Sequence, residues 1–83
     1  MQIDRERMQK GDTVWYRWSQ RPEVYGPYKV KKVFGAHDGT HVMLKSVTMS
    51  DERQLLLADD EDFGALLFYD ANPEQPNEWD TDN

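Results

Sequence analysis

Apolar and polar residues alternate along the first half of the chain in the way that β-strands require. In residues 13–19, the side chains of Val14, Tyr16 and Trp18 fall on one face of an extended segment, and Trp15 falls on the other. We place the first three in the core. The large indole of Trp15 is then partly outside, where another segment covers it or a partner binds it.

A second strand is expected to begin at Pro27, because proline is tolerated as the first residue of a strand. Tyr28 and Val30 continue the inward pattern, but Val33 follows Val30 by three residues rather than two. A β-bulge at residues 31–32 would return Val33 to the inner face and bend the strand. Such a bend is what the closure of a small barrel needs.

A hairpin turn is predicted at residues 35–39, where Asp38-Gly39 is the strongest signal. A strand over residues 40–47 follows it. Two inward sets remain open for this strand: Val42 with Leu44, or His41 with Met43 and Val47. Either set supplies one half of the buried face of the hairpin.

The second half of the chain predicts two more strands and a loop. Residues 53–58 make a fourth strand, and its leucines at 55–57 are apolar on both faces, as expected for burial on both sides or for a face that binds a partner. Residues 59–62 form an acidic loop. Residues 63–69 are either a last strand that pairs with the first or a short helical turn that leads into such a strand, because periodicity does not separate the two at this length.

These elements and the length of the chain bound the fold. A chain of 83 residues forms one domain at most, and it buries only about 60% of the surface that its unfolded form exposes. The pattern predicts an all-β domain built as a small barrel or sheet. Its single core is expected to contain Val14, Tyr16, Val30, Val33, Leu44 and Leu55.

Composition excludes several classes of protein. The chain has no cysteine, which excludes disulfides, cysteine–zinc sites and thiol catalysis. No run approaches the ~20 apolar residues of a membrane helix. The first residues also lack the apolar segment of a signal peptide. We therefore expect a soluble, cytoplasmic protein.

Charge is divided unevenly between the two halves of the chain. Residues 1–50 carry nine Lys/Arg and five Asp/Glu, whereas residues 51–83 carry one arginine and eleven acids, for a net charge of −6. A basic half joined to an acidic segment is typical of proteins that bind nucleic acid or compete with it. A tail that only keeps the protein soluble is an equally good interpretation.

Two stretches carry a resemblance to a known family. Residues 11–15 read Gly-Asp-Thr-Val-Trp, and residues 25–33 read Tyr-Gly-Pro-Tyr-Lys-Val-Lys-Lys-Val. With the strand that follows, over residues 11–47, they resemble the GPY/F module of gypsy-class retrotransposon integrase C-terminal domains. More loosely, they resemble chromo-, Tudor- and KOW-type SH3-like barrels. The acidic second half is unlike the basic C-termini of these integrases.

This resemblance implies a five-stranded SH3-like barrel with a role in nucleic-acid binding or multimerisation. Size and likeness suggest an accessory protein of a phage or another mobile element. The chain then divides into a flexible N-terminal lead (1–10), an SH3-like barrel (11–69) and a disordered acidic tail (70–83). The tail is rich in Pro, Asn and acids, so it cannot bury enough apolar surface to offset its ordering entropy.

No pattern of catalytic or metal-binding residues stands out. His37 and His41 lie near Asp38, but around a turn, and no cysteine or third histidine completes a metal site. The acidic loop at residues 59–62 matches only crudely the spacing of oxygen ligands in an EF-hand. A barrel of this size rarely has the pocket that acid–base catalysis by paired carboxylates needs. We expect no metal, no cofactor and no enzymatic activity.

The candidate binding surface is a cluster in which cations and aromatic rings alternate, as in grooves for single-stranded nucleic acid. Charged outward faces are also what any soluble barrel displays. The candidate residues are Trp15, Arg17, Trp18, Arg21, Tyr25, Tyr28, Lys29, Lys31 and Lys32.

Three functions are compatible with this surface. The first is a non-enzymatic module that binds a protein partner through exposed aromatics and a sheet edge. The alternative is a nucleic-acid-binding barrel whose acidic tail tunes affinity, and a weaker third is an acidic mimic of DNA. The protein partner is preferred, because the acidic half of the chain repels phosphate at long range.

Overall fold

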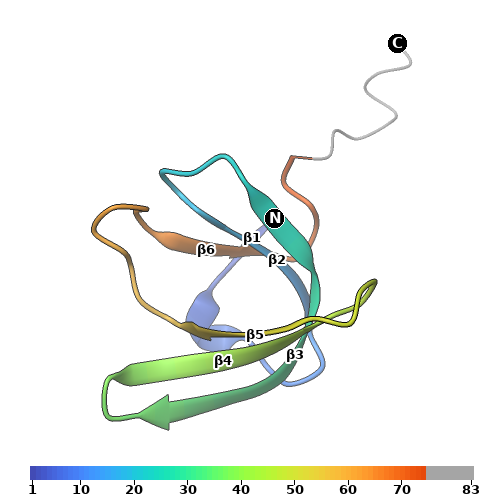
Figure 1. Ribbon diagram of the computed structural model, residues 1–83, viewed down its shortest axis with the longest axis horizontal. Helices are drawn as coiled ribbons and strands as arrows, with labels where there is room; N and C mark the ends of the chain where they lie inside the picture. The colour runs from blue at the N-terminus through green and yellow to red at the C-terminus, as the bar shows by residue number, and fades with distance from the viewer. Residues whose placement is uncertain (75–83) are drawn as a thin grey trace.

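One antiparallel sheet contains all the strands of the computed structural model, which describes residues 1–74 (Figure 1). The elements in chain order are β1 (Gln2–Ile3), the 3-10 helix η1 (Arg5–Arg7), β2 (Thr13–Trp18), β3 (Val24–Ala36), β4 (Gly39–Ser46), β5 (Glu52–Leu56) and β6 (Leu66–Tyr69). Across the sheet, the strands follow the order β1-β6-β2-β3-β4-β5. The all-β prediction is confirmed.

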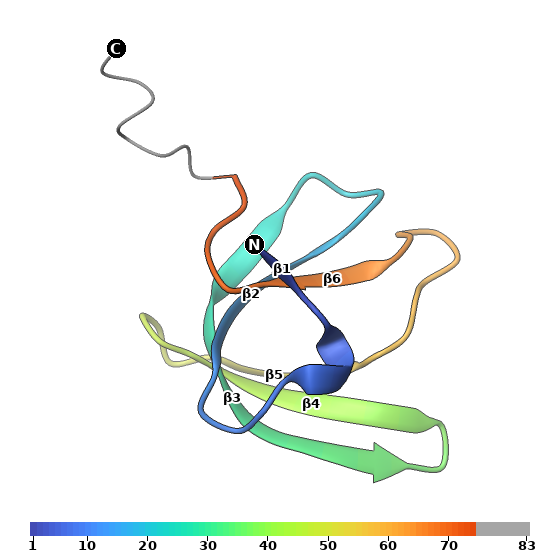
Figure 2. The same ribbon diagram turned by 180° about the vertical axis from the view of Figure 1, so that it is seen from behind.

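The sheet has six strands and is open, where the sequence predicted five. β1 and β5 form its two ends and do not pair with each other within the described residues. The sheet curves strongly, and η1 lies between β6 and β4 in both views (Figures 1 and 2). Arg5 and Glu6 of η1 line a hollow together with Val33, Thr40 and Leu57. Side chains of η1, β3 and β4 thus face one another across this hollow, with no strand hydrogen-bonded between the two ends within the described residues.

The additional strand is β1, within the segment that was expected as a flexible lead. Gln2 and Ile3 pair with Tyr69 and Phe68 of β6. Farther along the same segment, Met8 is buried in the core. A strand of two residues is too short to show alternation, so the sequence pattern contained no signal for it.

Nine apolar side chains form a single core on the inner face of the sheet. They are Met8, Val14, Tyr16, Tyr28, Val30, Val42, Leu44, Leu66 and Phe68. Val14, Tyr16, Val30 and Leu44 are buried, as the alternation predicted. Leu55 packs against this core and is half-buried. Of the two inward sets left open for β4, the one with Leu44 is correct.

The predicted bulge in β3 is present, but the prediction that Val33 lies in the core was wrong. The register between β3 and β4 shifts between Val30 and Lys32, which places Val33 opposite the buried Val42. Its side chain is nevertheless 38% exposed. The reason is that the pairing of β3 with β2 ends at Lys29. Val30 still bonds to the backbone of Gly11 and Asp12, but from Lys31 onward β3 has no paired strand on that side within residues 1–74.

The segment over residues 63–69 contains the last strand, β6, which begins at Leu66 and follows a turn. Residues 66–69 of β6 pair with residues 15–18 of β2. The strand therefore lies beside the first strand that the sequence predicted. A bridge between Asp60 and Gly64 closes the acidic loop that precedes it.

The predicted acidic tail and the predicted absence of a membrane helix can be compared with the structure only over residues 1–74. Most of the predicted acidic tail, residues 75–83 with Trp79, lies outside the described residues. In the part of the chain that is described, no helix is long and apolar enough to cross a membrane.

Candidate nucleic-acid interface

Four lysines gather on the outer face of β3 and β4. Side chains alternate across a strand, and the neighbours of Lys29 and of its register partner Lys45 fill the core, so these two lysines face outward. The bulge keeps both Lys31 and Lys32 on the same outer face, where both are exposed. We call Lys29, Lys31, Lys32 and Lys45 the lysine face.

No ion pair between residues 1–74 involves a lysine, so the positive charge of the lysine face is not neutralised in this way. Lys29 and Lys45 stand directly opposite each other, an arrangement in which like charges destabilise a sheet. Glu52 is opposite Lys45 on the next strand. Repulsion between Lys29 and Lys45 therefore costs stability. Glu52 offsets part of this cost, and an anionic ligand would offset more of it.

An aromatic stack borders the lysine face. The rings of Phe34 and His41 are stacked, with centroids 5.5 Å apart and planes 15° apart, and Lys32 Nζ lies 5.1 Å from the centre of the Phe34 ring. His41 Nε2 is 2.8 Å from Asp38 Oδ1, and Gln54 Nε2 donates to His41 Nδ1 at 3.2 Å. The hydrogen bond from His41 lowers the pKa of the Asp38 carboxyl. Both nitrogens of the imidazole are thus held in place.

The arginines of the predicted cluster lie apart from these lysines. Arg17 Nη2 donates to the carbonyl of Arg21 at 2.9 Å, and the guanidinium of Arg21 lies 5.0 Å from the centre of the Phe63 ring. Lys29 pairs with Thr13, four residues before Arg17 on β2, which separates the two groups by about 13 Å along the strand. The structure thus divides the predicted basic cluster into two.

Two of the predicted aromatic residues are engaged inside the sheet. Tyr25 stacks on Tyr16 with ring centres 5.1 Å apart, and Tyr28 is only 4% exposed. The guanidinium of Arg53 lies 4.9 Å from the Tyr25 ring and 5.4 Å from the Tyr28 ring, and its Nη1 donates to the Tyr16 hydroxyl at 2.8 Å. Asp51 accepts from Arg53 Nε at 3.3 Å. We call these five residues the inner cluster.

The phenols of Tyr16 and Tyr28 have raised pKa values and are neutral at pH 7. Burial, together with the hydrogen bond to Asp51, raises the pKa of Tyr28 to about 12. Burial also raises the pKa of Tyr16, although Arg53 acts in the opposite direction. Both hydroxyls are therefore protonated at physiological pH and act there as hydrogen-bonding groups to Asp51 and Arg53.

The two tryptophans of the predicted site lie on opposite faces of β2. Trp18 packs against the core and meets Phe63 edge-on at 6.1 Å. Trp15 is half-buried on the outer side, against the backbone of Gly26, where an added Cβ would come within 2.5 Å of the indole. Gly26 has a φ of +152°, so a side chain there is excluded by both space and conformation. Neighbouring backbone thus covers part of the Trp15 ring.

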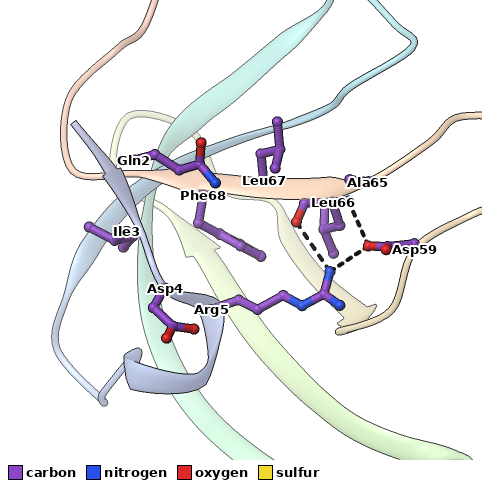
Figure 3. A pocket seen from close by; sticks show the side chains of 9 residues that line it. All are labelled: Gln2, Ile3, Asp4, Arg5, Asp59, Ala65, Leu66, Leu67 and Phe68. Atoms are coloured by element: carbon purple, nitrogen blue, oxygen red, sulfur yellow. Dashed lines mark hydrogen bonds and ion pairs between the residues drawn. The ribbon is translucent and has the colours of Figure 1, made fainter.

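A hollow of about 520 Å³ lies along β6, beside β1 (Figure 3). Arg5 Nη1 reaches across it, 2.8 Å from Asp59 Oδ1, and donates to the carbonyl of Leu66 at 3.3 Å. The N–H of Leu66 donates to the same carboxylate at 3.4 Å. The hydrogen bond from Arg5 lowers the pKa of Asp59. Arg5 and Asp59 thus bond to the backbone of β6 at Leu66, beyond the two residues of β6 that pair with β1.

Some residues of the candidate interface were not identified from the sequence. They are Phe34, His41, Lys45 and Gln54, which share the outer face of β3, β4 and β5. The register of the hairpin brings these residues together, and the two-residue turn at residues 37–38 sets that register. The position of this turn is the sequence signal that could have identified them. No group of three His, Asp or Glu side chains suited to a metal ion is present within residues 1–74.

In comparisons with protein-family models, curated proteins and solved structures, none matched this chain.

Proposed function

We propose that this protein is a non-enzymatic nucleic-acid-binding module whose lysine face contacts the phosphate backbone. The observation that carries the proposal is the arrangement of four lysines on one outer face, outside the ion pairs of residues 1–74. Lysine is a flexible point charge that binds phosphate without strict geometry. Phosphate contacts of this kind supply most of the affinity in binding without sequence preference.

An SH3-like barrel is the fold that accompanies this proposal. Its support is the strong curvature of the sheet, the meander from β2 to β5 and the return of β6 beside β2. The stretch that resembles the GPY/F module, residues 25–33, contains three of the four lysines. The nucleic-acid role implied by that resemblance agrees with the proposed use of this face.

Affinity for a labelled 20-nucleotide strand, measured by fluorescence anisotropy between 25 and 300 mM NaCl, tests the proposal. With four phosphate contacts, log Kd should change with log salt with a slope of about 3 in magnitude. The variant Lys29→Gln/Lys32→Gln should lower both the affinity and the slope.

The matched control is Arg7→Gln/Lys10→Gln, which removes the same charge from two exposed residues outside the face. It should change the affinity little. If both variants lost affinity equally, net charge rather than the lysine face would account for the binding. A lack of binding at 25 mM NaCl would contradict the proposal outright.

A protein partner is the second candidate, supported by the free edge of β5. Within residues 1–74 this strand pairs only with β4, and an extended segment can add to such an edge. Leu56 on β5 and Val47 and Met49 in the preceding turn are exposed. A partner retained from nuclease-treated host lysate by the wild type and by Lys29→Gln/Lys32→Gln, but not by Leu56→Lys, would favour this candidate over the first.

A further inference from the structure

We infer that Phe34 is a stacking platform for an unpaired base, so that the lysine face selects single-stranded over duplex nucleic acid. This inference rests on the proposed function and specifies its ligand. Phe34 lies two residues after Lys32 on β3 and five after Lys29, a distance of about 16 Å along an extended strand. A strand whose phosphates follow the lysines therefore reaches this ring within a few nucleotides.

The ring of Phe34 is held in the orientation that stacking requires. The ring of His41 stacks on it with an angle of 15° between the two ring planes. The two ring nitrogens of His41 contact Asp38 and Gln54. Burial adds to this support, since the side chain of His41 is only 14% exposed. Phe34 itself is partly exposed. The platform is thus preorganised, which reduces the entropy lost when a ligand binds.

A lysine ammonium group lies over the Phe34 ring in the free protein. His41 stacks on this ring, and Lys32 Nζ lies 5.1 Å from its centre. This ammonium group belongs to a flexible side chain and not to the core. An incoming base would take its place over the ring, and Lys32 would then be free to contact the neighbouring phosphate.

Stacking on Phe34 separates single strands from duplexes. Bases in a duplex are already stacked on each other and do not offer a ring face, whereas every unpaired base does. The lysines would contact the phosphates of either form. The base-dependent part of the affinity should therefore depend on Phe34, and the salt-dependent part on the lysines.

The experiment compares three labelled ligands: a thymidine 12-mer, an abasic 12-mer with the same phosphates, and a 12-base-pair duplex. Phe34→Leu should weaken binding of the thymidine 12-mer by about 5- to 150-fold, the range expected for one stacked base. It should leave the other two ligands and the salt slope unchanged. Phe34→Trp keeps an aromatic face and should restore the affinity. Thermal unfolding followed by circular dichroism verifies that each variant is folded.

The outcomes separate the two levels of the proposal. If the wild type binds the abasic and thymidine strands equally well, or if Phe34→Leu weakens all three ligands alike, the stacking role is overturned while phosphate binding stands. If polyglutamate competes as well as the thymidine strand, the face recognises charge alone and the inference again falls. If the wild type binds no oligonucleotide, both the inference and the proposed function are overturned.

Discussion

The inner cluster and the lysine face both combine cations with aromatic rings, yet their chemistry differs. In the inner cluster, one guanidinium lies over two rings and also donates to the Tyr16 hydroxyl and to Asp51. On the lysine face, four ammonium groups share a surface with one stacked aromatic pair. None of these four ammonium groups takes part in an ion pair within residues 1–74. Cations beside aromatic rings are thus not by themselves a binding signal. What distinguishes the two regions is whether the donors already have partners.

The chemistry of the two cations explains this difference. The planar guanidinium of Arg53 can stack on aromatic rings while its N–H groups donate hydrogen bonds in the plane of the guanidinium itself. It therefore joins several groups at once. An ammonium group is more strongly hydrated and carries a point charge, and it is suited to an exposed surface. The inner cluster should therefore determine stability, and the lysine face should determine binding.

The largest test of this division is Tyr16→Ala. Removing a fully buried aromatic side chain typically costs 3–5 kcal/mol in the free energy of unfolding, on the order of half the stability of a small domain. Urea unfolding followed by tryptophan fluorescence measures the loss. The control is Phe34→Ala on the outer face, which should cost less than half as much. Equal losses would mean that the outer stack is as structural as the inner cluster.

A smaller effect is expected from the pH dependence of the inner cluster. The pKa of Tyr28 is raised to about 12, above its ordinary value of 10.0, so its contribution to stability is fully present below pH 10 and is lost as the pH rises toward 12. Tyr28→Phe should cost about 1 kcal/mol at neutral pH through the lost hydrogen bond to Asp51. It should also make the decline above pH 10 shallower in urea unfolding. An unchanged decline would show that the Tyr28 phenol is not involved.

The smallest effect is expected from Lys29→Glu, and its sign is opposite. This change replaces repulsion across the Lys29–Lys45 pair by attraction, which should stabilise the sheet by about 0.2–1 kcal/mol. Binding of a single strand at 25 mM NaCl should weaken at the same time. A variant that is both less stable and equally tight in binding would remove the distinction between the two regions.

Alternation in the sequence predicted the faces of single strands better than the relations between strands. Val14 and Tyr16 face inward because period-two alternation within β2 is local, and the three-residue spacing before Val33 correctly indicated a bulge. The same pattern could not show that the pairing of β3 with β2 ends at Lys29, which leaves Val33 exposed.

The candidate site was predicted in part, for the same reason. The lysines of β3 were identified because they are adjacent in sequence. Phe34 and His41 meet only because the turn uses residues 37–38, one position earlier than the Asp38-Gly39 signal suggested. Tyr25 was expected at the surface, but the irregularity between β2 and β3 places it opposite the inward-facing Tyr16. Register and bulges are properties of strand pairs, and a single strand's pattern does not contain them.

The place of β6 between β1 and β2 ties the two ends of the described chain into one cooperative unit. On the side of β2 away from β3, residues 15–18 pair with residues 66–69, so the whole segment between them must be brought back before those contacts can form. A chain that stops before Leu66 lacks two buried side chains, Leu66 and Phe68, and leaves β2 as a bare edge. The meander from β2 to β5 is therefore not an autonomous folding unit. During synthesis, we expect the domain to stay unfolded until β6 has left the ribosome.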